Sequence, residues 1–188
     1  MVRSKTLWTV KNKKELSLLK SQGFLEANFK ISTDFWEGDF TPAYLWMNDQ
    51  MKKKISTYQK DLPLWAWTKR PDFRSYRVNI PKGESAFLIE FNKNPQEILI
   101  SDFQNWHCVL NGYPFFSEKE ESSLEKKYGT FFIDYWNNVY NFEKETPKNI
   151  KKMVEKSWQN IFKNVEHGQA TFGRLNISEV FSIKEYKR

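Results

Sequence analysis

The sequence predicts an α+β fold, in which a mainly antiparallel small sheet, or pair of sheets, has helices packed around it. Two observations predict this class. Most expected strands are neighbours along the chain, and four expected helices follow one another without a strand between them, unlike the strict alternation of a doubly wound parallel sheet. In addition, no internal repeat and no Gly/Ser/Pro-rich linker divides the 188 residues, so we expect one domain spanning residues 1–188.

The chain opens with a short strand and a capped helix. Residues 7–10 read as the first strand. Asn12 and Glu15 have the spacing of a capping box, in which each side chain bonds the backbone N–H of the other. Gly23 is placed to end this helix in a left-handed turn, and Phe24-Leu25 follow.

A second helix is expected to start at Thr41. Pro42 suits its first turn, because that position needs no backbone donor. The helical period places Tyr44, Met47 and Met51 on one buried face. This helix is therefore expected to pack on the sheet.

A tryptophan-rich strand is expected after Pro63. The alternation of a strand places Trp65 and Trp67 on one face, and Leu64, Ala66 and Thr68 on the other. Two indole rings thus share a surface of the sheet.

Residues 86–91 and 98–100 form the clearest pair of strands, and the turn-like residues 92–95 separate them. Ser101 and Gln104 have the spacing of another capping box, which would start a helix ending near residue 110. Further helices are expected over residues 118–127, 130–139 and 147–162, and closing strands over residues 169–175 and 180–186.

The composition bounds the compartment and the partners. The net charge of +7 favours encounters with nucleic acid, nucleotides or other anions, although Lys-rich codon usage would give the same excess. The single cysteine, Cys108, excludes an internal disulfide and fits a reducing compartment. No signal-like or membrane-spanning apolar run occurs, so we expect a cytoplasmic protein with no membrane partner.

Several enzyme classes are excluded by missing motifs. The sequence has no Gly-rich phosphate loop, no H-E-x-x-H, no G-x-S-x-G and no Cys/His group with metal-ligand spacing. We therefore expect no metal site.

Three polar residues are candidates for catalysis. Glu90 shares a strand face with Ala86 and Leu88, where a carboxylate facing a pocket could act as a base or an electrostatic stabiliser. His107 follows Trp106 just beyond a strand, and Asp102 precedes it in the first turn of the same helix. The structural alternatives are a solvated Glu90, a His107 bound to a backbone carbonyl and an Asp102 that stabilises the helix start.

The eight tryptophans have two interpretations. Their large apolar bodies suit either a packed core or a surface that stacks a planar ligand. Trp8, Trp65 and Trp67 are of most interest, because these three lie on expected strands near a basic segment. Arginines alternate with aromatic residues in that segment, a pattern typical of surfaces that bind phosphate and stack bases. Its candidate binding residues are Lys69, Arg70, Arg74 and Arg77.

Nearly the whole chain resembles a bacterial family known as domain of unknown function 3841. The resemblance is carried by these stretches: Leu7-Trp8-Thr9-Val10, Phe40 to Met47 with Met51, Leu64 to Trp67, Ile98 to Phe103 with Trp106-His107 and Val109 to Asn111, and Gln169 to Phe172. The family implies no activity and no catalytic residues.

The order of the elements also looks like that of ADP-ribosyltransferase-like domains, which cleave NAD between two small sheets. This resemblance implies NAD as cofactor, with Trp8 and Trp67 stacking its rings, Thr9 as a catalytic residue that fixes a ribose, and Thr68 on the middle strand. Glu90 or Asp102 would supply the late carboxylate, and Tyr44 would line the pocket. The alternative function is a non-catalytic module that binds nucleic acid or a partner protein through a basic aromatic surface.

Overall fold

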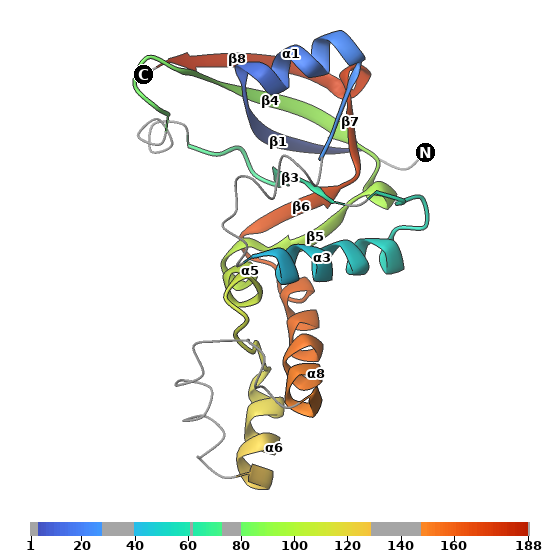
Figure 1. The fold of residues 1–188 in the computed structure, drawn as a ribbon, viewed down its shortest axis with the longest axis vertical. Helices are drawn as coiled ribbons and strands as arrows, with labels where there is room; N and C mark the ends of the chain where they lie inside the picture. The colour runs from blue at the N-terminus through green and yellow to red at the C-terminus, as the bar shows by residue number, and fades with distance from the viewer. Residues whose placement is uncertain (1–3, 28–39, 61, 73–79, 129–147, 188) are drawn as a thin grey trace. The chain divides into compact units, whose positions relative to one another are not determined.

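The computed structural model confirms the α+β class, with several helices, a six-stranded sheet and a separate two-stranded sheet (Figure 1). It describes residues 4–27, 40–60, 62–72, 80–128 and 148–187. The chain forms two compact units, one of residues 1–100 with 168–188 and one of residues 101–167. The assignment of one domain to residues 1–188 stays a prediction.

The six-stranded sheet has the strand order β5-β6-β3-β1-β4-β8. The pairs β6–β3, β3–β1, β1–β4 and β4–β8 are all antiparallel. Its strands are β1 (Lys5–Asn12), β3 (Leu64–Trp67), β4 (Ser85–Lys93), β5 (Leu99–Asp102), β6 (Gly168–Phe172) and β8 (Val180–Lys187). The small antiparallel sheet consists of β2 (Phe24–Glu26) and β7 (Arg174–Asn176).

Helix α1 (Lys13–Gln22) starts and ends as predicted. The Glu15 N–H donates to Asn12 Oδ1 at 2.8 Å, and the Asn12 N–H donates to Glu15 Oε2 at 3.0 Å. Gly23 adopts φ +79°, a left-handed conformation that costs glycine little, and its N–H bonds the Leu19 carbonyl. Two local sequence signals therefore fix both ends of this helix.

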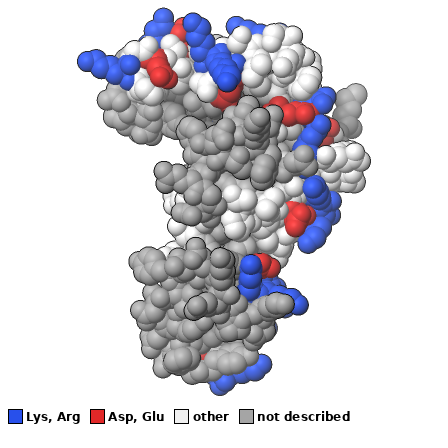
Figure 2. Space-filling model, in the orientation of Figure 1, with Lys and Arg blue, Asp and Glu red and all other residues white. Residues whose placement is uncertain are grey.

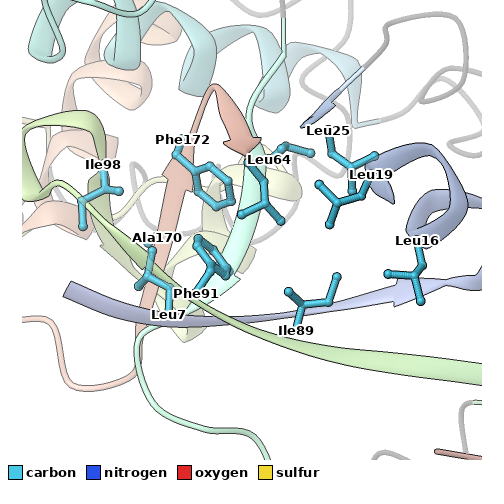
Figure 3. Packing of buried hydrophobic residues seen from close by; sticks show 12 residues of the cluster. Leu7, Leu16, Leu19, Leu25, Leu64, Ile89, Phe91, Ile98, Ala170 and Phe172 are labelled. Carbon is cyan, nitrogen blue, oxygen red and sulfur yellow. The ribbon is translucent and has the colours of Figure 1, made fainter. Parts of the chain in front are cut away.

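The main core lies on one face of the six-stranded sheet, under α1 and the β2–β7 pair (Figure 3). Leu7 and Phe91 are completely buried there, and the rings of Phe91 and Phe172 lie 5.3 Å apart. Burying each side chain of this size stabilises the fold by roughly 1.5–3 kcal/mol. The cluster comprises Leu7, Leu16, Leu19, Leu25, Leu64, Ala66, Ile89, Phe91, Ile98, Ala170, Phe172 and Leu175.

Helix α3 (Thr41–Lys54) begins at the predicted residue, with proline in its first turn. It lies alongside β6 (Figure 1), where Thr171 Oγ1 is 4.0 Å from the Met47 sulfur. Met47 and Met51 are fully buried, as predicted, whereas Tyr44 is half-buried. Since Thr171 is the register partner of Trp65, α3 packs on the face of the sheet opposite the main core.

The predicted pairing of residues 86–91 with 98–100 is wrong. Both segments are strands, but β4 pairs with β1 on one side and β8 on the other, and β5 neighbours β6. Two eight-residue partners offer β4 more ladder contacts than the four-residue β5. The Asn94 side chain accepts the Gln96 N–H and opens a 3₁₀ turn over Pro95–Glu97, rather than a hairpin.

The second unit contains α5 (Phe103–Leu110), α6 (Glu118–Tyr128) and α8 (Lys148–Ser157), and α8 continues as a 3₁₀ turn over Trp158–Phe162. These helices match three predicted ones, while the predicted helix 130–139 lies outside the described residues. The predicted cap at Ser101 is wrong, because Asp102 caps α5 and Ser101 is a buried strand residue. An aspartate accepts helix N–H groups at least as well as serine.

The predicted closing strand over residues 169–175 is divided at Gly173 into β6 and β7. A Cβ atom at Gly173 would lie 3.0 Å from the Tyr58 ring, so this position is sterically restricted. The second closing strand is β8, as predicted. In the described part of the chain, none of the helices has the length and apolar character required to cross a membrane.

Candidate functional site

The face of the sheet opposite the main core carries a cross-strand row of aromatic and polar side chains. Trp8 on β1 lies directly opposite Trp67 on β3 and, on its other side, opposite Glu90 on β4. Residues that are directly opposite in an antiparallel pair share a face and lie close together. Gln169 and Ser182 extend the row, because they are the register partners of Trp67 and Glu90. We call the surface formed by Trp8, Trp65, Trp67 and Glu90 the tryptophan face.

The tryptophans of this face differ in exposure from those of the helices. Trp8, Trp65 and Trp67 are each half-buried, whereas Trp106 and Trp158 retain 4% and 2% of their surface. The Trp8 indole nitrogen is buried and has no hydrogen-bond acceptor among the described residues. Indole N–H groups usually find a hydrogen-bond acceptor when they are buried, so the unpaired N–H of Trp8 is unusual.

Glu90 lies at the polar edge of the tryptophan face and is paired with Arg70. The Arg70 guanidinium is 3.4 Å from Glu90 Oε1, with the side chains 53% and 18% exposed. Because the Arg70 side chain is largely exposed, this ion pair contributes little to the stability of the fold. Stability therefore does not explain why Arg70 and Glu90 lie next to each other. A register shift between Glu90 and Phe91 places a bulge in the β4–β8 pairing, a feature that is frequent beside functional sites.

The tryptophan face is polar at one end and apolar at the other. One pleat from the Trp8–Glu90 pair, Thr6 lies opposite Asn92, and the Thr6 hydroxyl donates to Asn92 Oδ1 at 2.9 Å. On the other side, Trp8 packs with Val10 against the cluster of Ile80, Ala86 and Leu88. A ligand with an apolar ring and a hydrophilic end would therefore have a defined orientation on this surface.

Tyr44 of α3 covers the Trp65 end of the face. The two rings meet edge to face, with centroids 5.9 Å apart and an interplanar angle of 81°. Burial raises the pKa of Tyr44 to about 12, so its hydroxyl is neutral near pH 7 and can donate a hydrogen bond but not act as a base. Trp65 is thus partly a packing residue.

The two predicted threonines donate to backbone carbonyls. Thr9 lies on the core face, is 4% exposed, and its hydroxyl donates to the Trp65 carbonyl at 3.0 Å. The Thr68 hydroxyl donates to the Gly168 carbonyl at 2.7 Å, and so does its N–H at 3.0 Å. Both hydroxyls therefore serve the β1–β3–β6 pairing in this structure.

Asp102 and His107 belong to the second unit. Asp102 is 3% exposed and accepts four backbone N–H groups, from Gln104, Asn105, Glu166 and His167, at 2.9–3.0 Å. Burial opposes its ionisation, but these four donors outweigh burial and hold the pKa of Asp102 below its ordinary value.

His107 is exposed, and its Nδ1 lies 3.0 Å from the Phe103 carbonyl, which is the structural alternative that the sequence offered. Its neighbour Cys108 is half-buried, and burial raises the pKa of the Cys108 thiol. Neither arrangement is that of an activated nucleophile with its base.

The predicted basic segment is described only at its start. Lys69 and Arg70 are exposed, while Arg74 and Arg77 lie outside the described residues. In Figure 2, blue and red side chains of the described residues stand beside one another at several places on the face shown. No group of three or more His, Cys, Asp or Glu is arranged to hold a metal ion in the described ranges.

Comparison with known proteins supplies a family. The model of the family described as Domain of unknown function (DUF3841) matches residues 6–186. The chain belongs to the DUF3841 family. No curated protein and no solved structure gave a match. The tryptophan face of this DUF3841 domain lies entirely within the matched residues.

Some residues beside the tryptophan face of this DUF3841 protein gave no signal in the sequence. Asn92 reads as part of a turn, and Thr6 and Ser182 read as ordinary strand residues. Their places follow from the β1–β4 and β4–β8 registers, which join segments about 80 to 100 residues apart. Arg70 and Glu90 were individually predicted, but their pairing needs the same long-range register.

Proposed function

We propose that this DUF3841 protein binds a nucleotide or a nucleotide-containing cofactor, with NAD as the first candidate, on the tryptophan face. The observation that carries the proposal is the row of Trp67, Trp8 and Glu90 across three strands, with Arg70 paired to Glu90. Indoles stack planar rings, and an arginine binds phosphate oxygens with charge-assisted bonds. Packing alone does not require a partly buried carboxylate and an exposed guanidinium beside two half-buried indoles.

If NAD is also cleaved, Glu90 is the carboxylate of the site. In hydrolysis, the bond between the ribose C1′ and the nicotinamide nitrogen breaks, and its electron pair leaves with nicotinamide. Water then bonds to C1′ and releases a proton, which gives ADP-ribose. The ionised Glu90 would stabilise the positive charge that develops on the ribose ring. Asp102 already accepts four backbone N–H groups, so Glu90 is the better candidate.

A titration of NAD into the full chain tests binding, with tryptophan emission excited at 295 nm and calorimetry as a second readout. We expect saturable binding that weakens about threefold in Trp67→Phe or Trp8→Phe, since the smaller phenyl ring keeps only part of the stacking, which contributes roughly 1–3 kcal/mol per base when the whole ring is removed. Trp106→Phe is the matched control, because it also removes one indole but from the second unit. Equal affinity in all three variants, or no heat at millimolar NAD, contradicts the proposal.

Release of nicotinamide, followed by chromatography, tests turnover separately. We expect release by the wild-type chain and a loss of at least tenfold in Glu90→Gln, with NAD binding retained. Binding without release restricts the proposal to a binding module.

Single-stranded nucleic acid is a second candidate, favoured by the exposed Lys69 and Arg70 that directly follow Trp67 and Thr68 on the chain. Aromatic residues on an antiparallel sheet stack successive bases, and nearby cations bind the backbone. This function predicts affinity for a short oligonucleotide that falls steeply with salt and is weakened by Arg70→Ala. A free nucleotide, in contrast, would show a shallow salt dependence.

A further inference from the structure

We propose that the polar end of the tryptophan face recognises the ribose diol and the phosphate of its ligand, so that the site selects ribonucleotides over 2′-deoxyribonucleotides. This inference rests on the proposed function. It assigns roles to Glu90, Arg70 and Asn92, while the base stacks on Trp8 and Trp67.

The face presents aromatic and polar groups next to one another, as a nucleotide does. A nucleotide presents a planar base, then a ribose with two hydroxyl groups, then a phosphate. The face presents the opposed indoles of Trp67 and Trp8, then the Glu90 carboxylate opposite Trp8, and the Arg70 guanidinium lies 3.4 Å from that carboxylate. A base on the indoles therefore brings its ribose toward Glu90 and its phosphate toward Arg70.

Glu90 has the acceptor capacity that a ribose diol requires. An ionised carboxylate accepts only, at two oxygens with about four lone-pair positions. Arg70 lies against Oε1, and Oε2 makes no hydrogen bond to the described residues. Two adjacent hydroxyl donors, the 2′-OH and 3′-OH of ribose, can bond one carboxylate together, whereas 2′-deoxyribose offers only one.

Asn92 supplies a donor beside the same carboxylate. It is exposed, and its Oδ1 accepts the Thr6 hydroxyl, so the amide Nδ2 group points its donors elsewhere. Asn92 and Glu90 are two residues apart on β4 and therefore share a face. An acceptor and a donor side by side match sugar hydroxyls, each of which can both donate and accept.

Calorimetric titration of the full chain with adenosine, AMP and 2′-deoxy-AMP tests this inference. We expect AMP to bind about tenfold more tightly than 2′-deoxy-AMP, the effect of one hydrogen bond to a charged acceptor. Glu90→Gln should reduce this preference to less than threefold, and Arg70→Ala should remove the advantage of AMP over adenosine. Glu185→Gln, at an exposed position of β8 in the same sheet, should change neither ratio.

The outcomes separate this inference from the proposed function. Equal affinity for AMP and 2′-deoxy-AMP, with binding still weakened by Trp67→Phe, overturns ribose recognition and leaves nucleotide binding intact. No binding of any of the three ligands or of NAD overturns both. If Glu90→Gln fails to fold by circular dichroism, Asn92→Ala is the second variant, and an unchanged AMP to 2′-deoxy-AMP ratio in it counts against the inference.

Discussion

Replacing Asp102 by alanine should destabilise the second unit strongly. The carboxylate is 3% exposed, caps α5 through the N–H groups of Gln104 and Asn105, and accepts those of Glu166 and His167 at 3.0 and 2.9 Å. Loss of an N-cap costs about 1 kcal/mol, and each further N–H left without its acceptor costs about 1 kcal/mol or more. We therefore expect the free energy of unfolding of Asp102→Ala to fall by about 3 kcal/mol.

Urea unfolding followed by circular dichroism measures this loss, and hydrogen exchange locates it at the start of α5 and near residue 166. Asp49→Ala is the matched control, since Asp49 is exposed on α3, and it should stay within about 0.5 kcal/mol of wild type. The folded pKa of Asp102 is lowered, so its contribution is present above its ordinary pKa of 3.8 and is lost as the pH falls through the lower folded value. A loss below 1 kcal/mol near pH 7, or a difference from wild type that grows on acidification, would refute this reasoning.

Three further predictions concern the first unit. Gly168→Ala places a Cβ atom 2.3 Å from Thr68 Oγ1 and should cost about 1–3 kcal/mol in a thermal melt, with a smaller cost in a Thr68→Ala background. Asn12→Ala removes the capping box of α1 and should cost about 1 kcal/mol, whereas a loss below 0.3 kcal/mol contradicts the cap's role. The pKa of Tyr44 is raised to about 12, so its neutral form stabilises the fold below pH 10 and this contribution is lost as the pH rises from 10 toward 12. Wild type should therefore lose about 2 kcal/mol more than Tyr44→Phe over that range, and identical pH profiles would show that burial does not hold the phenol neutral.

Local patterns predict much of this fold. The capping box of Asn12 and Glu15, the left-handed Gly23 and the start of α3 at Thr41 each depend on residues within one or two helical turns. The alternation in β3 correctly separates half-buried Trp65 and Trp67 from buried Leu64 and Ala66. Such features need no knowledge of distant segments.

Strand pairing could not be predicted in the same way. The neighbours of β4 are β1 and β8, about 80 and 100 residues away, while the strand that follows it along the chain lies elsewhere in the sheet. The cap of α5 shows a smaller error of the same kind, since Asp102 was favoured over Ser101 partly by donors from Glu166 and His167.

The candidate site depends on both kinds of information. Strand alternation predicts that Glu90 faces the same side as Leu88, and the structure confirms it. That Trp8 lies between Trp67 and Glu90 follows only from the registers of β1 with β3 and β4. The sequence therefore predicted the individual residues but not the cross-strand row that they form.

The central claim is that Trp8 and Trp67 form a ligand-binding surface and do not serve only in the packing of the fold. Two-dimensional NMR of the indole N–H groups tests it most directly, with the signals assigned by Trp→Phe variants at each of the eight positions. On addition of AMP or NAD, we expect the Trp8 and Trp67 signals to shift in a saturable way, while those of the buried Trp106 and Trp158 stay in place. Saturable shifts confined to other tryptophans, or no shift at millimolar ligand, would contradict the claim.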